Sequence, residues 1–388
     1  MSRGPASRIR AGLALACAGL TAGCGTQAAT VAVTRPPAVT ASLSTSLTTA
    51  QGTWAIAVMG GSAASHNNFW QLLVRRANTG RWSLATPEGV ADNGGLVAAG
   101  GNGSLVVGFR PSQELAYSPL ATSTDAGLNW TPGLLDAALA NTPGAIAVGP
   151  SGRTLALLQD GTIEAAPTAD DAAAGRWRPL ATLKALAASA PGRSCGLKGM
   201  TAVSFGPDQN PIAAGSCVRP GAAGVFTDAG GTWRSAGLTL PTGGPGMGTV
   251  RVLGLTALPG GNAALVATGD SLVAAWWDGT RWTVSAPVTA DGVRALGFGP
   301  GGSAWLLLDS GRAETIAGAG SAWRALPPVP AGTTVLAPPG TGTLAPGTGG
   351  SYDALAVSGS RLTVWRLVRG AWGKVQQITV PVQYGSSG

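Results

Sequence analysis

The sequence has 388 residues, of which 61 are Gly, 27 are Pro and only 11% are charged. This composition argues against a protein of long surface helices, and the plentiful apolar residues argue against disorder of the whole chain. The formal net charge is +8, but the basic residues are scattered, which is a poor pattern for nucleic-acid binding. Since His66 is the only histidine and no cofactor motif occurs, we expect neither a metal site nor a cofactor.

The N-terminal segment has the features of an export signal. Arginines at positions 3, 8 and 10 precede an apolar run over residues 11–23 that is too short to span a bilayer. The run ends in LTAGC, which resembles a bacterial lipoprotein signal with Cys24 as the acylated residue. We therefore expect residues 1–23 to be removed and the protein to stay at the outer face of the cytoplasmic membrane or cell envelope. The alternatives are ordinary secretion without use of Cys24, or later release from the cell.

The segment that follows the signal is interpreted as a tether. Residues 24–51 are rich in Thr, Ala, Ser, Val and Pro and show no regular period, which is typical of a solvated, disordered linker. The membrane is therefore expected to be contacted through the lipid only. We expect the folded domain to span residues 52–384, with a short tail at 385–388.

The domain is predicted to be an array of repeats. A tryptophan preceded by a turn that contains glycine recurs at spacings of 41 to 56 residues, which indicates a modular architecture. The seven tryptophans are Trp82, Trp130, Trp177, Trp233, Trp282, Trp323 and Trp372.

Within each period, two apolar runs of strand length flank a Gly/Pro turn, as in AIAVGPSGRTLALL at 145–158. A third strand leads into the glycine turn and a fourth begins at the tryptophan. Such units favour four-stranded antiparallel blades, and hence an all-β, seven-bladed β-propeller. The first unit shows only three strands, so its inner strand must come from the tether or from the C-terminal VQQITVPVQY. A ring of six or eight blades is the alternative to seven.

Two of the tryptophan turns share a longer motif. STDAGLNW at 123–130 matches the Asp-box pattern S-x-D-x-G-x-T/N-W, and FTDAGGTW at 226–233 keeps most of it. Through these motifs the chain resembles the Asp-box, or BNR-repeat, β-propellers, which include sialidases, sortilin-like receptors, some glucanases and photosystem assembly factors. The aspartates can accept hydrogen bonds from the turn, the glycines can take a positive φ, and the indoles can pack between blades. The residues expected to be structural are Asp125, Gly127, Trp130, Asp228, Gly230 and Trp233.

The resemblance implies that ligands bind on the face opposite the Asp-boxes. Strand order assigns to that face a set of cations at the starts of inner strands and in adjoining loops, where they could bind carboxylate or phosphate. Solubility alone is the other explanation for them. The ligand-binding candidates are Arg110, Lys198, Arg219, Arg251 and Arg294. Cys195 and Cys217 are an even pair in an exported protein, so we expect a disulfide, on the same face.

An enzyme is the alternative to a binding protein. The FRP element at 109–111 faintly resembles an arginine motif of sialidases, but a sialidase also needs further arginines, a Tyr/Glu nucleophile pair and an acid. The chain has only four glutamates and three tyrosines, with no evident pair, and we name no catalytic residue. We therefore expect a monomeric, non-catalytic scaffold that binds an envelope protein, glycan or anionic polymer. The alternative is an exo-acting glycoside hydrolase of sialidase type.

Overall fold

The computed structural model describes residues 44–49, 51–60, 68–77, 79–87, 95–100, 103–109, 119–134, 144–219, 221–240, 250–290, 292–338 and 351–380. The chain divides into two compact units, Met1–Pro36 and Pro37–Gly388, and every described residue belongs to the second. Within these ranges no helix is both long and apolar enough to cross a bilayer. The expectations for residues 1–23, Cys24 and the tail at 385–388 lie outside the described residues.

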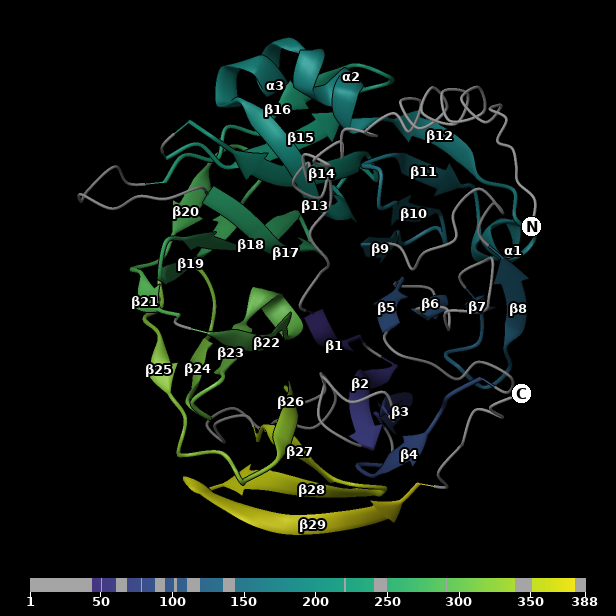
Figure 1. The fold of residues 1–388 in the computed structure, drawn as a ribbon, viewed down its shortest axis with the longest axis vertical. Helices are drawn as coiled ribbons and strands as arrows, with labels where there is room; N and C mark the ends of the chain where they lie inside the picture. The colour runs from purple at the N-terminus through teal and green to yellow at the C-terminus, as the bar shows by residue number, and fades with distance from the viewer. Residues whose placement is uncertain are drawn as a thin grey trace, which may run out of the picture. The chain divides into compact units, whose positions relative to one another are not determined.

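The second unit is mostly β, with antiparallel groups of four strands that follow one another in the sequence (Figure 1). Three groups form separate sheets. The first is β5 (Gly95–Ala99), β6 (Leu105–Phe109), β7 (Pro119–Ser123) and β8 (Thr131–Leu134). The second is β9 (Ala145–Val148), β10 (Thr154–Leu157), β11 (Ile163–Ala166) and β12 (Arg178–Ala181). The third is β26 (Thr333–Ala337), β27 (Asp353–Ser358), β28 (Arg361–Val368) and β29 (Ala371–Thr379).

The other strands lie in two larger sheets, each of which joins two groups. One sheet holds β1 (Ser44–Thr48), β2 (Gly52–Gly60), β3 (Asn68–Arg76) and β4 (Trp82–Leu84), together with β22 (Val293–Phe298), β23 (Ala304–Leu308), β24 (Ala313–Ile316) and β25 (Arg324–Ala325). The other holds β13 (Leu197–Phe205), β14 (Pro211–Cys217), β15 (Gly224–Asp228), β16 (Trp233–Ser235), β17 (Val250–Leu258), β18 (Gly261–Thr268), β19 (Ser271–Trp277), β20 (Trp282–Val284) and the short β21 (Val288–Thr289).

The first strand of each group lies innermost in Figure 1 and adjoins the first strand of the next group, from β1 through β5, β9, β13, β17 and β22 to β26. β26 in turn adjoins β1 and β2, so the last group in the chain lies beside the first. Because each group is covered by neighbours on both faces, its central strands are apolar throughout rather than alternating. β23, for example, is buried at all five positions. The prediction of a mostly antiparallel β protein is confirmed.

The position of strand β1 shows that the predicted tether extends too far toward the C-terminus. Residues Ser44–Thr48 lie inside the predicted 24–51 linker, yet they pair antiparallel with β2 and parallel with β22. The Ser46 hydroxyl donates to the carbonyl oxygen of Leu336 in β26 at 2.8 Å. The missing inner strand of the first group therefore comes from the N-terminal side, whereas the C-terminal β29 is an outermost strand. A Thr/Ser-rich segment can be ordered in this way because the sheets supply partners for its backbone groups.

Within the described ranges, three short α-helices interrupt the strands, and none of them was predicted. They are α1 (Ala169–Ala173), α2 (Leu183–Ala188) and α3 (Ala190–Cys195), and a single 3-10 turn, η1, covers Pro300–Gly302. Each α-helix begins after a hydroxyl residue whose side chain accepts a hydrogen bond from the first turn, namely Thr168, Thr182 and Ser189. Such capping residues are a sequence signal for helix starts. The helices are too short to show a helical period.

The repeated tryptophans connect neighbouring groups. In four of them the indole N–H donates to a residue of the group before, counting the last group as the neighbour of the first. The donor and acceptor residues are Trp82 and Asp353 (2.9 Å), Trp282 and Ala236 (2.8 Å), Trp323 and Ser285 (3.2 Å), and Trp372 and Pro327 (3.2 Å). An indole can bury a large ring between two sheets and still satisfy its one donor in this way. In these four repeats the tryptophan thus joins one group to the next, whereas the indole N–H of Trp177 donates to Ala172 of its own group at 3.1 Å.

Candidate functional site

In the Asp-box at residues 123–130, the carboxylate of Asp125 is hydrogen-bonded within its own turn. Asp125 Oδ1 accepts hydrogen bonds from the backbone N–H groups of Leu128 (3.0 Å) and Asn129 (2.9 Å), and the Ser123 hydroxyl donates to the same oxygen at 2.8 Å. Asp125 Oδ2 accepts from the side-chain amide of Asn129 at 2.7 Å. Gly127 has a φ of +75°, which glycine adopts without steric cost. Both carboxylate oxygens are therefore engaged by the turn itself.

These hydrogen bonds favour the ionised carboxylate. Donation from the Asn129 backbone lowers the pKa of Asp125 to about 2, against the opposing effect of partial burial, with further lowering by the side chains of Asn129 and Ser123 and by the Leu128 backbone. The turn WWDGTRW at residues 276–282, which keeps the Asp, a Gly and the final Trp of the motif, behaves in the same way. The hydroxyl of Thr280 and the backbone of Arg281 lower the pKa of Asp278 to about 2. A carboxylate held ionised by its own turn is a poor proton donor at neutral pH.

The second Asp-box, which has Phe226 in place of the serine, has fewer contacts. Asp228, which is 6% exposed, accepts a hydrogen bond from the backbone N–H of Gly231 at 2.7 Å. Gly230 has a φ of +67°. Trp233 begins β16, and its ring packs against the apolar cluster that contains Cys195 and Phe226. The aspartates of both boxes therefore organise hairpins rather than face a cavity.

Three of the candidate cations occupy equivalent places. Lys198, Arg251 and Arg294 are each the second residue of an inner strand, in β13, β17 and β22. Arg294 is engaged: its guanidinium lies 3.2 Å from Asp309 Oδ1 and donates to the carbonyl oxygens of Asp309 (2.8 Å) and Thr333 (3.4 Å). Lys198 and Arg251 are exposed, and within the described part of the chain neither forms an ion pair or a side-chain hydrogen bond.

Lys198 and Arg251 lie on either side of one strand end. In the sheet, Cys217 of β14 pairs with Leu197 on one side and with Val250 on the other, and each of these residues directly precedes one of the two cations. They thus belong to one surface at the beginning of the inner strands.

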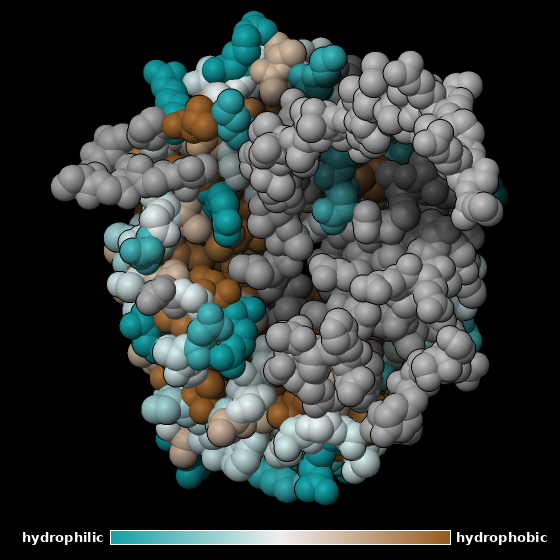
Figure 2. Space-filling view, in the orientation of Figure 1, coloured by the Kyte–Doolittle hydropathy of each residue, from teal (hydrophilic) through white to brown (hydrophobic). Residues whose placement is uncertain are grey.

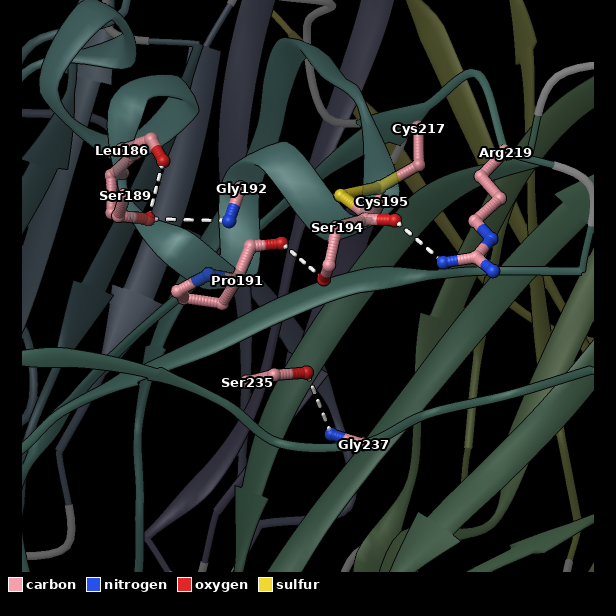
Figure 3. Close-up of a disulfide and its surroundings, with 10 residues drawn as sticks. All are labelled: Leu186, Ser189, Pro191, Gly192, Ser194, Cys195, Cys217, Arg219, Ser235 and Gly237. Carbon is pink, nitrogen blue, oxygen red and sulfur yellow. Dashed lines mark hydrogen bonds between the residues drawn. A yellow bond between two sulfur atoms is a disulfide. The ribbon is translucent and has the colours of Figure 1, made fainter.

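A disulfide joins Cys195 of α3 to Cys217, with Cα atoms 5.3 Å apart (Figure 3). Arg219 follows it and is fixed to the same helix. Its backbone N–H donates to the carbonyl oxygen of Cys195, and its guanidinium donates to that of Ser194, both at 3.1 Å. The cross-link therefore places Arg219 beside the Lys198/Arg251 surface, whereas Arg110 lies outside the described residues.

A cavity of about 320 Å³ lies along the inner strands. Its described lining consists of apolar residues, glycines and hydroxyl residues, the last including Ser46, Thr48, Ser204 and Thr256. No Asp, Glu, His, Cys, Tyr, Lys or Arg is part of that lining, so the candidate cations do not converge on it. The described residues also contain no group of three or more metal-ligating side chains. The cavity can offer hydrogen bonds to an uncharged molecule, but its described walls provide no acid or base.

Sequence reasoning missed a buried ionic cluster, here called the closure cluster, which consists of Arg75, Trp82, Asp353 and Arg366. Asp353 is fully buried; its Oδ2 accepts from Arg75, from the Trp82 indole at 2.9 Å and from Arg366 at 3.0 Å. Its Oδ1 accepts from the Arg366 Nε at 2.8 Å. The guanidinium carbon of Arg75 also lies 5.4 Å from the centroid of the Trp82 ring. The cluster joins the last group of strands to the first.

The environments of the two arginines differ. Burial lowers the pKa of Arg75, although Asp353 acts in the opposite direction. Hydrogen bonding to Asp353 raises the pKa of Arg366. One signal for the cluster was available in the sequence: Asp353 is the only acidic residue after Glu314, and it directly precedes the apolar run ALAV. An isolated acid next to a buried strand indicates a partner of opposite charge.

Comparison with solved structures supports the fold. No protein-family model matches the sequence, and no curated protein matches it. A protein from Lactobacillus plantarum superposes with a TM-score of 0.51 at 12% identity, covering 85% of this chain and 97% of that one. The GH74 xyloglucanase from Xanthomonas campestris superposes with a TM-score of 0.50 at 14% identity, covering 86% of this chain and 53% of that one. At such identities the similarity shows the fold alone, which is β-propeller-like.

Proposed function

We propose that this protein is an exported lipoprotein whose folded part is a seven-bladed β-propeller of the Asp-box family. It acts as a non-catalytic scaffold that binds a protein, glycan or anionic polymer at the cell envelope. Residues 1–23 are the signal, Cys24 carries the lipid, and each of the seven groups of strands is one blade. The seven groups, the neighbouring first strands and the two Asp-boxes support the architecture.

The observation that carries the binding function is the surface formed by Lys198 and Arg251. Both side chains are exposed, both follow residues paired to Cys217, and neither has a partner among the described residues. Cations at such a position can form charge-assisted hydrogen bonds to carboxylate or phosphate without first breaking an internal ion pair. Arg219, fixed beside the disulfide, adds a third positive charge to the same surface.

The chemistry of the aspartates supports binding over hydrolysis. Asp125 and Asp278, whose pKa values are about 2, are hydrogen-bonded within their own turns, and the described cavity lining has no titratable side chain. Glycoside hydrolysis by the common mechanisms needs two carboxyl groups on either side of the scissile bond. The sialidase alternative would depend on Arg110.

Two measurements on the full-length protein in detergent test the proposal. Fluorescein-labelled inorganic polyphosphate is expected to bind with a marked salt dependence, and the double variant Lys198→Ala/Arg251→Ala is expected to bind about tenfold more weakly. The matched control is Arg178→Ala/Arg234→Ala, two exposed arginines on the outermost strands β12 and β16. Equal affinity of the two double variants for polyphosphate would show that Lys198 and Arg251 do not form the binding surface.

The second measurement is turnover of fluorogenic sialosides, for which we expect no activity. If sialosides were turned over and Arg110→Ala abolished the turnover, the glycoside hydrolase alternative would be supported and the scaffold proposal would be wrong.

A further inference from the structure

The charges of the domain are segregated between blades. The whole chain has no acidic residue before Glu88, and after Glu314 it has only Asp353, which is fully buried. The two groups β1–β4 and β26–β29 therefore have one described acid, which is used in the closure cluster. Their described cations are Arg75, Arg76, Arg81, Arg361, Arg366, Arg369 and Lys374. Taken together, the other five groups have 13 described cations and 11 described acids, although the stretch from α2 to β16 has more cations than acids.

Four cations of these two groups have no ion-pair partner among the described acids. Arg81, Arg361, Arg369 and Lys374 are exposed, and no described acid forms an ion pair with any of them. Lys374 donates only to the amide oxygen of Gln377, at 2.6 Å. The outer surface of these blades is therefore positive, which would concentrate an acidic partner there.

The outermost strand of the same region is unusually long. β29 has nine residues, whereas the outermost strands of the other six groups have from two to four. In the described structure β29 pairs with β28 alone, so one row of its backbone N–H and C=O groups has no strand beside it. Figure 1 shows β29 along the margin of the molecule, and Figure 2 shows hydrophilic and intermediate residues over that margin.

Apolar side chains accompany this edge. Val368 and Val375 are 54% and 50% exposed, and Leu84 of the adjacent β4 is 39% exposed. The two blades are held in register here, because the Gln376 amide accepts from the backbone N–H of Trp82 at 3.0 Å and donates to its carbonyl oxygen at 2.7 Å. The unpaired cations are distributed along this long edge: Arg369 lies in the turn before β29, Lys374 lies within it, and Arg361 of β28 pairs with Thr379 at its far end.

We propose that the outer edge of β29 is a docking site for an extended acidic segment of a partner protein, which adds to the sheet as a fifth strand. Main-chain hydrogen bonds would provide affinity, while acidic side chains facing Arg361, Arg369 and Lys374 would provide specificity. A second copy of this chain does not fit, because two β29 edges would bring the same cations together. The site is separate from the Lys198/Arg251 surface, so each can fail without the other.

The test uses the full-length protein in detergent and a fluorescein-labelled nine-residue peptide of alternating Val and Glu. We expect the peptide to bind, and we expect its analogue with every residue N-methylated, which keeps the charges but loses the main-chain donors of both strand edges, to show no measurable binding. The triple variant Arg361→Gln/Arg369→Gln/Lys374→Gln is expected to bind about tenfold more weakly. The control triple Arg178→Gln/Arg234→Gln/Arg281→Gln, at exposed cations on or next to other outermost strands, is expected to leave affinity unchanged.

Several outcomes would overturn this inference. If the N-methylated peptide bound as tightly as the unmodified one, charge alone would explain the binding. If the control triple variant lost as much affinity as the β29 triple variant, the binding would not be specific for β29. Binding to vesicles with 30% anionic lipid, without binding to the peptide, would make the surface a membrane contact instead. If Lys198→Ala/Arg251→Ala lost peptide binding and the β29 triple variant did not, the peptide would bind at the Lys198/Arg251 surface. The inference about β29 would then be wrong, whereas the proposed function would still stand.

Discussion

Arg75 and Asp353 lie 278 positions apart in the sequence and form an ion pair that is almost completely removed from solvent. Their elements, β3 and β27, belong to the first and last groups of strands. The guanidinium of Arg75 also donates to the carbonyl oxygen of Pro338 at 2.7 Å and to the hydroxyl of Thr53 at 3.3 Å. The pair thus joins the two ends of the folded chain through a fixed set of hydrogen bonds.

The first prediction concerns this pair. Asp353→Ala would leave Arg75 buried without its counter-charge, and breaking a buried pair from one side typically costs about 3–5 kcal/mol. We expect a loss of that order in the free energy of unfolding measured with denaturant. Arg281→Ala, which removes an exposed partner of Asp278, is the control and should cost less than about 1 kcal/mol. Similar small losses in both variants would refute a role of the pair in joining the first group of strands to the last.

The second prediction concerns the Asp-box. Asp125→Ala removes the acceptor for two backbone N–H groups of its turn, much as loss of a helix cap does, and should lower the free energy of unfolding by about 1–2 kcal/mol. Binding of polyphosphate should not change. Asp208→Ala is the matched control, since this exposed aspartate has no hydrogen bond in the described structure and should change stability by less than about 0.5 kcal/mol.

The third prediction is a pH dependence of the same residue. The pKa of Asp125 is lowered in the folded state from 3.8 to about 2, so its stabilising contribution is fully present above the unfolded-state pKa. The contribution should be lost as the pH falls from about 4 toward about 2. The free-energy difference between wild type and Asp125→Asn should therefore be constant from pH 7 to pH 5 and shrink below pH 4. A difference that stays constant down to pH 2 would contradict the assignment.

The fourth prediction concerns the disulfide. Cys195 and Cys217 are separated by 22 positions, and a cross-link that closes a loop of this length is worth about 3 kcal/mol. The double variant Cys195→Ser/Cys217→Ser should unfold at correspondingly lower denaturant concentration and should bind polyphosphate more weakly, because Lys198 and Arg251 flank the bond. A reducing agent should shift the unfolding of wild type but leave that of the double variant unaltered.

The fifth prediction concerns β1. Ser46→Ala removes one hydrogen bond to Leu336 and should cost about 1 kcal/mol of unfolding free energy. Ser46→Pro should cost clearly more, because β1 is paired on both sides, with β2 and β22, and proline cannot donate to either. Equal effects of the two substitutions would mean that β1 is not needed for the stability of the sheets.

The amino-acid sequence by itself determined the features that arise from neighbouring residues. The Gly/Pro turns, the apolar runs around them and the recurring tryptophans predict antiparallel strands in repeated groups of four, because turns and strands of this kind are specified within about ten residues. The roles of Asp125 and Gly127 were predictable for the same reason, since the hydrogen bonds to the Asp125 carboxylate come from residues 123, 128 and 129 and Gly127 takes its positive φ within the same turn. The capping residue Thr168, three positions before Asp171, could have indicated a helix start.

Only the tertiary structure decided which distant residues meet. Ser46 lies in a segment that has the composition of a linker. This segment forms the inner strand β1 because β2 and β22 provide partners for its backbone groups. In the sequence Arg294 appeared equivalent to Lys198 and Arg251. In the structure it is the one of these three cations that forms an ion pair with a described acid, Asp309 on an adjoining loop. The pairing of Arg75 with Asp353 depends on the two ends of the folded chain lying side by side. Contacts of this kind are set by the closure of the sheets on one another, which no local pattern of residues encodes.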